Sequence, residues 1–489
     1  MIFILISPII VLLFGASLEL IVSSKKNLQF CIASITSLVS LLFSSIILTQ
    51  VIRQGVLVMS VGDWGAMGIT LVSDRLSAIM LVISNIIGFV CLVYSYFDID
   101  EIRTRHGFYP MVLALLAGVN GTLLTGDLFN LYVWFEVLLI SAFGLLTLGN
   151  TKEQLKGALP YVFLNLFAST LLLLGIGALY GITGSLNMAD LSSKLSLMGD
   201  QWPKLTISLL FLLALGIKAA VFPLFFWLPV SYHTPPVTVT ALFSALSTKV
   251  SIYGLIRLFT LFFYKEMEQL KMILLVIASL TMLVGVLGAA GQNDFRRILS
   301  FHIISQIGYM IMGVAFFTAY SLAGATFFVV HNMLVKSSLF LISGLAEKIF
   351  GSSHLSKQGG LFQSHPPIAL FFLLSAFSLT GLPPLTGFWG KLILAQSGIK
   401  IGEYLVVGIS LLVSLMTLFS MTKIWIHSFW QSPSGSRESC GFMAYPVYVL
   451  CLVAFAPALM PGPILEYFME IGAELIRPDL YIEAVRMRR

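Results

Sequence analysis

The stretch GIKAAVFPLFFWLPVSYHTPP, residues 216–236, is an apolar run that contains a lysine, Lys218, and the prolines Pro223 and Pro229. Proline has no backbone N–H and its ring clashes with the preceding helical turn, so a helix through this stretch is expected to open there. If that helix crosses a bilayer, its open backbone must be buried in protein or line a wet cavity, because lipid offers no hydrogen bonds. The stretch therefore predicts a broken membrane helix beside a buried charge.

The composition of the chain indicates that lipid surrounds most of it. Of 489 residues, 58% are hydrophobic and only 10% are charged, and the mean hydropathy is +0.97, whereas about 25% of the residues of a soluble domain are charged. This balance predicts an all-α, polytopic membrane protein. The net charge of +6 does not indicate nucleic acid, because the basic residues are scattered in short loops or buried and form no stripe.

Apolar stretches of spanning length follow one another along the chain, which we treat as a single transmembrane domain of residues 1–489. They number about fourteen by the twenty-residue criterion. The first has its basic residues, Lys25 and Lys26, after it and has no small-residue cleavage site, so it is expected to remain as a helix. The stretches lie near 2–22, 29–50, 72–96, 108–125, 128–148, 158–180, 205–228, 237–263, 272–290, 298–317, 321–345, 367–396, 403–428 and 444–460.

A second broken helix is predicted in FSLTGLPPLTGFWGKLILAQ, residues 377–396, which contains Pro383, Pro384 and Lys391. It lies five spans after the first, and a shift by an odd number of spans reverses the direction through the membrane. Paired broken helices in two halves of opposite direction are typical of inverted repeats around a transport site. We therefore expect a first five-helix repeat at about 108–263, with its broken helix at 205–228, and a second at about 272–428, with its broken helix at 367–396.

The distribution of basic residues between alternate loops predicts the orientation. One set of loops holds Lys25, Lys26, Arg103, Arg105, Lys152, Lys156, Arg296, Arg297, Lys348, Lys357 and Arg437. The opposite loops hold Arg53, Lys194, Lys204, Lys265, Lys271 and Lys400. The richer set is placed on the cytoplasmic side, which puts both termini outside, although a basic tail opposes this assignment. The tail residues are Arg477, Arg486, Arg488 and Arg489.

Five ionisable side chains lie deep within the apolar stretches: Glu136, Lys218, Lys249, Lys336 and Lys391. Each costs at least about 2.5–3.5 kcal/mol at bilayer depth. A chain that retains several is expected to use them, and ion movement is the use that this depth favours. Lys218 is the natural partner of Glu136, and desolvation brings buried lysines toward exchange of protons. The alternatives are a structural ion pair at Glu136 and anchoring of each lysine by carbonyls freed at a kink.

Two histidines are candidate proton relays because histidine titrates nearest to neutral pH. They are His302 in LSFHIISQIGYM and His331 in FFVVHNMLVKSSLF. The alternative for each is a hydrogen-bonded core residue. His331 and Lys336 are five residues apart, so only a π-bulge would align them on one helix face.

Charges near the ends of the stretches have a simpler explanation. Arg257, Glu403 and Lys423 are expected to snorkel to the interface. Asp74 and Arg75 begin the third stretch and are expected to pack or pair at the interface.

Motifs for soluble chemistry are absent from the sequence. It contains no Walker loop, GxGxxG, GxSxG, HExxH or CxxC pattern. The four cysteines have no metal-ligand spacing and are interpreted as small apolar residues. We therefore expect no cofactor and no enzyme active site in this chain.

The segments resemble the antiporter-like membrane subunits shared by respiratory complex I, membrane-bound hydrogenases and Mrp-type cation/proton antiporters. The resemblance covers nearly the whole chain from the third span onward. The matching stretches are GDLFNLYVWFE, GIKAAVFPLFFWLP, STKVSIYGLIR, NDFRRILSFHIISQIGYM and GLPPLTGFWGK.

Within this family the D subunit of Mrp antiporters is most similar. This resemblance is carried by VGDWGAMGITLVSDRLSA, ITGSLNMADL, FWLPVSYHTPP and ELIRPDLYIEAVR. Complex I subunits are disfavoured because Ser244 stands where they tend to carry histidine, and Lys391 where one class has glutamate. The long C-terminal extension of the largest complex I and Mrp subunits is also missing.

The resemblance implies roles for individual residues. Glu136 and Lys218 would form a switch at the first half-channel, and Lys249 would be the central relay. His331 and Lys336 would continue the relay to Lys391, the terminal proton carrier at the second half-channel. His302 also matches a family position.

The resemblance further implies a place in the cell and a set of partners. The chain would be one subunit of a hetero-oligomer in the bacterial cytoplasmic membrane, with a larger homologous A subunit and small membrane subunits. The transported ions would be H⁺ and Na⁺. Two other interpretations stay open at this point: a proton-pumping subunit of a redox enzyme, and a scaffold whose buried charges only hold helices together.

Overall fold

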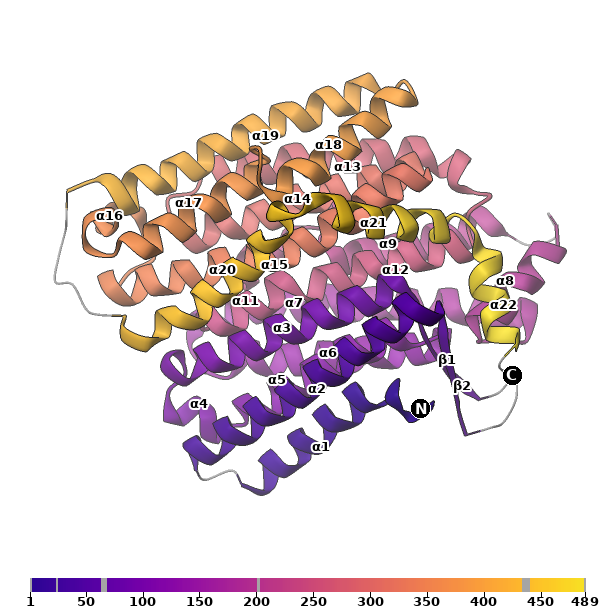
Figure 1. Cartoon of the computed structure of the whole chain (residues 1–489), viewed down its shortest axis with the longest axis horizontal. Coiled ribbons are helices and arrows are strands. Elements are labelled where there is room, and N and C mark those ends of the chain that lie inside the picture. Colours follow the sequence, from indigo (N-terminus) through magenta and orange to yellow (C-terminus); the bar gives the residue numbers. More distant parts are fainter. Residues whose placement is uncertain (1, 23–24, 63–67, 200–202, 433–439, 488–489) are drawn as a thin grey trace.

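The computed structural model describes residues 2–22, 25–62, 68–199, 203–432 and 440–487. Long helices lie side by side in one bundle, and the two termini lie at the same end of it (Figure 1). The predicted loop residue Arg437 and the tail residues Arg488 and Arg489 lie outside the described part of the chain.

Among the described residues, the first half of the chain contributes twelve α-helices and the second half ten. Those of the first half are α1 (Ser7–Ile21), α2 (Lys26–Gln54), α3 (Arg75–Asp98), α4 (Glu101–Arg105), α5 (Phe108–Leu124), α6 (Leu128–Thr147), α7 (Lys152–Thr183), α8 (Met188–Leu197), α9 (Lys204–Ala219), α10 (Trp227–Ser231), α11 (Val237–Ala245) and α12 (Ser247–Leu261). Those of the second half are α13 (Met267–Ala290), α14 (Phe295–Phe316), α15 (Ala319–Phe350), α16 (Leu361–Ser364), α17 (Pro366–Thr380), α18 (Thr386–Lys400), α19 (Tyr404–Ile424), α20 (Ala444–Leu459), α21 (Pro461–Leu475) and α22 (Pro478–Met487). Short 3₁₀ turns are η1 (Ile2–Ile4), η3 (Leu355–Lys357) and η5 (Gly441–Met443), and η4 (Trp425–Trp430) is a π-helical turn.

Ten helices of the described residues are long and apolar enough to cross a membrane on their own, counting α11 and α12 together as Val237–Leu261. Three shorter apolar helices, α1, α5 and α17, accompany them. The stretches predicted to be broken, 205–228 and 367–396, each hold two helices separated by non-helical backbone. The multi-pass helical architecture is therefore confirmed.

Polar side chains at the predicted boundaries cap the helices. The interruption predicted between 108–125 and 128–148 is present, and the Asp127 side chain accepts a hydrogen bond of 2.7 Å from the Asn130 N–H at the start of α6. Thr318 and Ser321 form a reciprocal capping box at the start of α15. Caps of this kind satisfy the free N–H groups of a first helical turn.

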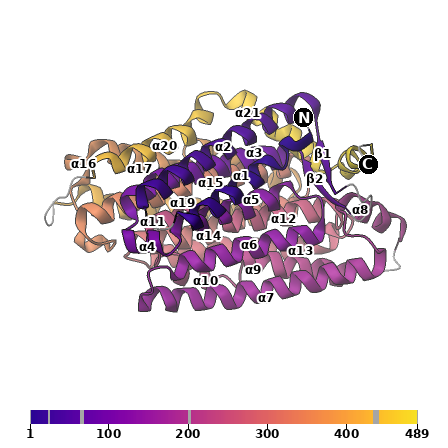
Figure 2. The ribbon, with the colours of Figure 1, turned by 90° about the horizontal axis from the view of Figure 1, so that it is seen from below.

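Two helices of equal length have opposite surroundings. α15 has 32 residues and is buried in the centre of the bundle over its apolar length. α7 also has 32 residues but lies along the outside of the bundle (Figure 2), where Leu159 and Phe163 are exposed. An apolar side chain on the outer face is suited to lipid, whereas every polar side chain of α15 must find a partner in protein or water.

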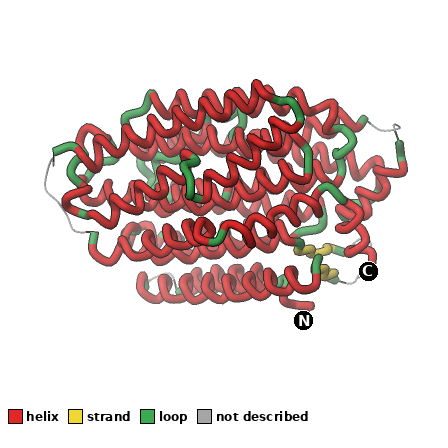
Figure 3. Tube along the Cα trace, turned by 45° about the horizontal axis from the view of Figure 1, so that its top comes forward, coloured by secondary structure: helices red, strands yellow, loops and turns green. Residues whose placement is uncertain are grey.

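The prediction of an all-α fold is wrong at one place. Strands β1 (Leu57–Val61) and β2 (Ile69–Ser73) form an antiparallel hairpin, in register from Leu57 opposite Ser73 to Val61 opposite Ile69. The hairpin lies at the end of the bundle that holds both termini (Figure 3, yellow). The strand pairing satisfies the backbone hydrogen bonds of the connection between α2 and α3. The sequence prediction missed the hairpin because it considered only the apolar stretches.

Two C-terminal helices were not predicted. α21 and α22 continue along the outside of the bundle toward the end that holds the termini (Figure 1). α21 packs against α15 so closely that a Cβ on Gly472 would lie 2.0 Å from the Ala319 carbonyl oxygen. Arg75 of α3 forms ion pairs with Glu470, at 2.9 Å, and with Glu474, so the third span pairs as expected.

Candidate functional site

Side chains supply hydrogen-bond partners to the backbone at the first helix break. α9 ends at Ala219, Ala220 has a left-handed conformation with φ of 61°, and helical structure resumes at Trp227. The Phe222 N–H donates to the Thr281 hydroxyl at 3.1 Å, and the Trp227 indole donates to the Ile217 carbonyl at 3.1 Å. These side chains replace the helical bonds that the break removes.

The two predicted prolines of this segment have different positions. Pro223 lies in the non-helical part, as expected. Pro229 does not break a helix, because it lies in the first turn of the short α10, where a missing N–H costs no helical bond.

Lys218 lies in the last turn of α9 and is buried. Its ammonium group donates to the Ser169 hydroxyl of α7 at 2.8 Å and lies 5.3 Å from the centre of the Phe135 ring. Glu136 of α6 is half-buried, and its Oε1 has no hydrogen-bond partner among the described residues. The charges of Lys218 and Glu136 interact, but the expected direct ion pair is not formed, because Ser169 holds the ammonium group.

A third helix break was not predicted. The stretch 237–263 was expected as one helix, but Leu246, with φ of −106° and ψ of −59°, separates α11 from α12. Lys249 is fully buried beside this break. Its ammonium group donates to the Ser244 carbonyl at 2.5 Å and to the Thr248 hydroxyl at 3.2 Å. The signal for the break was the run of hydroxyl residues around Leu246, since such side chains compete for backbone hydrogen bonds.

A small cavity lies between the first break and α12. Its volume is about 10 Å³, which is close to the space that one water needs. Lys218 and Asn165 line one side, and Ser247 and Ser251 of α12 line the other. The cavity therefore places room for one water between Lys218 and the helix that carries Lys249.

The second helix break is organised around Lys391. α17 ends at Thr380, Gly381 has φ of 91°, and α18 begins at Thr386, so Pro383 and Pro384 lie in non-helical backbone as predicted. The Lys391 ammonium group donates to the Thr380 carbonyl at 2.9 Å and to the Ser414 hydroxyl at 3.0 Å. It also lies 4.7 Å from the centre of the Tyr309 ring. The break thus supplies an acceptor to the lysine beside it.

His331 faces this second break. Its Nδ1 lies 2.9 Å from the Thr386 hydroxyl, which in turn lies 3.0 Å from the Ser378 hydroxyl. A Cβ on Gly387 would lie 1.8 Å from the Ser378 carbonyl and 2.9 Å from His331 Nε2. Only glycine at this position allows α18 to approach α17 and α15 this closely.

The π-bulge that would align His331 with Lys336 is not present in α15. α15, which the structure describes throughout, is continuous α-helix from Ala319 to Phe350. Lys336 is fully buried and donates to the Leu299 carbonyl of α14 at 3.2 Å, while His331 contacts Thr386 of α18. The two side chains therefore face different neighbours.

Several buried polar side chains of α14 and α15, two helices that pack against each other, lack hydrogen-bond partners among the described residues. His302 is fully buried, and neither of its ring nitrogens has a hydrogen-bond partner among the residues described. The same holds for both amide atoms of Gln306 and of Asn332, and for the Ser305 hydroxyl. Buried polar atoms in native proteins bond to protein or to ordered water, so we expect this contact to be hydrated.

The buried lysines and histidines of the second half of the chain interact with one another's charges. Lys336 interacts with the charges of both Lys249 and Lys391. His302 interacts with Lys336 and Lys391, and His331 with Lys391. The charges therefore form two groups of interacting neighbours, Glu136 with Lys218 and Lys249 with Lys336 and Lys391.

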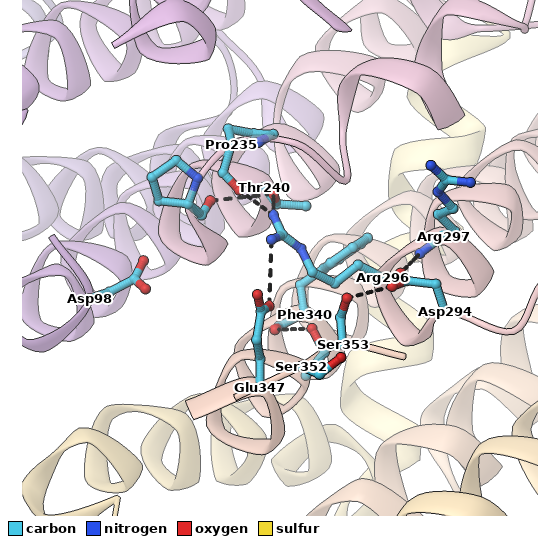
Figure 4. A network of polar contacts seen from close by, with 12 residues as sticks. Asp98, Pro235, Thr240, Asp294, Arg296, Arg297, Phe340, Glu347, Ser352 and Ser353 are labelled. Carbon is cyan, nitrogen blue, oxygen red and sulfur yellow. Dashed lines mark hydrogen bonds and ion pairs between the residues drawn. The ribbon is translucent and has the colours of Figure 1, made fainter. Parts of the chain in front are cut away.

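A charged cavity of about 600 Å³ lies at the end of the bundle where the basic loops were predicted. Figure 4 shows Arg296 at its wall, between Thr240 and Glu347. Arg296 donates to the Thr240 hydroxyl at 2.7 Å and to the Pro235 carbonyl, and it pairs with Glu347 at 3.5 Å. Thr240 lies one helical turn before Ser244, the acceptor of Lys249, so Arg296 at the cavity contacts the helix that bonds the central lysine.

Arg257 does not snorkel, which corrects the sequence prediction. It is buried and pairs with Asp74 at 2.6 Å, between the rings of Tyr253 and Tyr481. The reason is that Asp74 at the start of α3 and Tyr481 of α22 contact the Arg257 guanidinium group and cover it from water.

The other two charges expected to snorkel also have protein partners. Glu403 pairs with Lys271 at 2.7 Å. Lys423 donates to the carbonyls of Ala290 and Gln292, at 3.2 and 2.7 Å.

Broken helices around a row of buried charges define a class of polytopic membrane proteins that carry ions across the bilayer. The protein family described as "NADH:quinone oxidoreductase/Mrp antiporter, TM" matches residues 125–417 of this chain. The D subunit of the Na(+)/H(+) antiporter of Alkalihalophilus pseudofirmus is 40% identical over 485 residues, which cover 98% of each chain. This protein therefore belongs to the family of transmembrane subunits that NADH:quinone oxidoreductases and Mrp antiporters share.

Solved structures agree with this assignment. A chain of the Mrp complex from Dietzia sp. DQ12-45-1b has a TM-score of 0.92 and 31% identity, and the match covers 99% of both chains. A chain of respiratory complex I from Thermus thermophilus has a TM-score of 0.85 at 20% identity, over 97% of this chain and 99% of that one. The second likeness concerns the fold alone.

Proposed function

We propose that this chain is the D-type subunit of a multisubunit monovalent cation/proton antiporter and conducts protons from Glu136 through Lys218, Lys249 and Lys336 to Lys391. The observation that carries the proposal is that the charge of the buried Lys336 interacts with those of Lys249 and Lys391, while Lys218 and Lys391 both lie at helix breaks. The names of the antiporter relative and of the Mrp complex support Na⁺ as the ion moved in the opposite direction.

The switch at the first break works through the position of Lys218. In this structure its ammonium group bonds to Ser169 and adjoins the small cavity in front of α12. When Lys218 leaves Glu136, its positive charge is closer to Lys249, and like charges repel strongly in a medium of low dielectric constant. This favours release of a proton from Lys249 toward Lys336, and from there toward Lys391.

The proposal includes about fourteen spans and two inverted five-helix repeats, at about 108–263 and 272–428, within one domain. Matching loops support the repeats. Asp127 caps α6 and bridges to Asn187, just after α7. Asp294 caps α14 and bridges to His354, just after α15. The two bridges join corresponding helix ends of the two halves.

Corresponding positions extend to the row of lysines. Gly184 and Gly351 end the two 32-residue helices in left-handed conformation. Lys336 precedes Gly351 by the same number of residues as Ser169 precedes Gly184, so the two positions correspond. Ser169 is the acceptor of Lys218. In this interpretation the second repeat has a lysine, Lys336, at the position where the first repeat has Ser169, which accepts the hydrogen bond from Lys218.

The proposed setting is a hetero-oligomer in the bacterial cytoplasmic membrane, with a larger homologous A subunit and small membrane subunits. Both termini are placed on the outer side, and the charged 600 Å³ cavity then faces the cytoplasm. H⁺ and Na⁺ are the transported ions, and no cofactor is assigned to this chain.

Antiport is tested in inverted membrane vesicles that contain the complete complex, by the Na⁺-dependent collapse of a respiration-driven proton gradient. Glu136→Ala and Lys218→Ala are expected to assemble normally and to lose this collapse. The matched controls Glu153→Ala and Lys152→Ala remove exposed charges from the start of α7 and should leave it unchanged. Full activity of either Glu136→Ala or Lys218→Ala contradicts the proposed proton path.

The second candidate is a proton-pumping membrane subunit of a redox enzyme, which the shared fold with complex I favours. Purification of the assembled complex distinguishes the two. Flavin or iron–sulfur subunits in it, with proton uptake driven by electron transfer and independent of Na⁺, would establish the redox alternative.

A further inference from the structure

Glu19, in the last turns of α1, is a fully buried carboxyl group outside the row of lysines. Neither of its oxygens has a side-chain hydrogen-bond partner among the described residues, and the backbone N–H of Ala33 in α2 is the donor that interacts with the carboxyl group. An isolated carboxylate in a protein interior is strongly destabilising unless a proton or a cation neutralises it. The structure must therefore hold Glu19 either protonated or bound to a positive ion.

The basic side chains nearby do not neutralise Glu19. α1 packs against α2 and α5. Lys26, at the start of α2, donates instead to the Ile99 carbonyl of the α3–α4 connection at 2.7 Å, and Lys25 is exposed. Tyr109 of α5 is the titratable group of these helices that interacts with Glu19, and Tyr96 and the exposed Cys31 lie near Tyr109.

Two side chains on the helices packed against α1, Gln29 and Tyr109, offer oxygen atoms near Glu19. Gln29 of α2 is buried, and its amide nitrogen donates to the Glu19 backbone carbonyl at 3.4 Å, while its Oε1 has no partner in the described part of the chain. Tyr109 of α5 is fully buried, its hydroxyl lies near the Ser95 hydroxyl of α3, and it interacts with the charge of Glu19. Carboxylate, amide carbonyl and hydroxyl oxygens are the ligands that hard cations prefer.

A column of polar side chains leads inward from this group of oxygens. The buried face of α2 carries Ser37, Ser40 and Ser44, whereas its exposed face carries Ile35 and Leu42. The helix is thus polar toward the protein and apolar toward lipid, the reverse of a water-soluble helix. Gln29 and Ser44 are separated by about 22 Å along α2, at 1.5 Å per residue, so the column crosses much of the bilayer.

The inner end of the column is a closed hydrogen-bonded cluster. Ser40 donates to Asn85 Oδ1 of α3 at 2.8 Å, and Asn85 donates to Ser44 at 3.0 Å and to Asn120 Oδ1 of α5 at 3.1 Å. Asn120 also lies within reach of the Pro8 carbonyl of α1, at 3.5 Å. Four helices, α1, α2, α3 and α5, therefore surround one polar interior apart from the lysine row.

We propose that Glu19 is an ion-exchange site at the mouth of this column, where its carboxyl group holds either a proton or an alkali cation. Uptake of the cation releases the carboxyl proton, so the buried site stays neutral in both states. The choice of Na⁺ among alkali cations rests on the proposed antiport function. The site itself rests on Glu19, Gln29 and Tyr109.

The test uses dicyclohexylcarbodiimide, which modifies protonated buried carboxyl groups, on the complete complex in membranes, followed by peptide mass spectrometry. Glu19 is expected to be modified in choline chloride and protected in NaCl of equal ionic strength. Because one proton competes with one cation, the NaCl concentration for half protection should rise about tenfold for each unit decrease in pH. Exposed Glu101 is the matched control within the chain and should not respond to Na⁺.

Each other outcome contradicts the ion-exchange site. Modification of Glu19 that is equal in choline and Na⁺ would make it a proton-binding group only. Absence of modification, while Glu136 in the same sample reacts, would make it a structural group. Protection by Na⁺ does not require turnover, so this readout separates failure of the site from failure of the antiport function. In vesicles, Glu19→Gln should raise the half-maximal NaCl concentration for antiport at least threefold, and an unchanged concentration contradicts the site.

Discussion

Lys218 donates a hydrogen bond of 2.8 Å to the hydroxyl of Ser169, although its charge also interacts with that of Glu136. The ammonium group is therefore hydrogen-bonded to α7, while the carboxylate that attracts its charge lies on α6. A lysine with two alternative partners is suited to a switch, because each position presents its charge to a different part of the interior.

Replacement of Ser169 tests this pair of positions. Ser169→Ala removes the acceptor and is expected to shift Lys218 toward Glu136. The loss of a buried hydrogen bond of about 1–2 kcal/mol corresponds to a decrease of roughly 5–30-fold in the rate of Na⁺-dependent proton uptake. Ser169→Thr keeps a hydroxyl and should retain most of the activity. Equal rates for wild type and Ser169→Ala would show that the hydrogen bond has no role in transport.

Lys391 provides a test of proton transfer as distinct from charge. Lys391→Arg keeps the positive charge but cannot release a proton, because the guanidinium group stays protonated in proteins. We expect normal assembly and at least a tenfold slower Na⁺-dependent proton uptake in vesicles. Lys423→Arg is the matched control, since Lys423 also donates to backbone carbonyls but lies outside the row. A fully active Lys391→Arg variant would exclude Lys391 as a proton carrier.

Because α18 approaches α17 closely at Gly387, alanine substitutions at Gly387 and Gly408 are expected to have different effects on stability. Gly387→Ala would place a Cβ 1.8 Å from the Ser378 carbonyl oxygen, so α18 must move away from α17. We expect a decrease in the thermal unfolding temperature of the purified complex and loss of transport. Gly408→Ala, in α19, meets no described atom within 4 Å and should leave stability unchanged or raise it slightly, by about 0.5–1 kcal/mol. Similar unfolding temperatures for both variants would contradict this packing.

The buried Asp74–Arg257 pair predicts a cost for removing one charge alone. Asp74→Asn leaves the Arg257 guanidinium without its anionic partner and is expected to destabilise the protein by about 3–5 kcal/mol. The double variant Asp74→Asn/Arg257→Gln removes both charges and should recover part of that loss, as measured by the unfolding temperature and the yield of assembled complex. If the double variant is less stable than Asp74→Asn, the unpaired charge of Arg257 is not the cause of the destabilisation in Asp74→Asn.

The candidate site was largely predictable because its signals are local. An ionisable residue in an apolar run is visible without knowledge of its neighbours, and so are the prolines at 223, 383 and 384. The break at Leu246 was missed because no proline or glycine marks it. Glu19 was missed because it lies near the end of an apolar stretch, where a charge is usually solvated.

The sequence by itself determined the succession of membrane helices and two of their breaks, because hydropathy and the missing proline N–H act along a single chain. Only the tertiary structure decided which partner each buried charge meets. Lys218 bonds to Ser169, Arg257 pairs with Asp74, and Glu19 has no side-chain partner among the described residues. These outcomes depend on which helices pack together and on the few ångströms that separate their side chains, and neither is encoded in the periodicity of one helix.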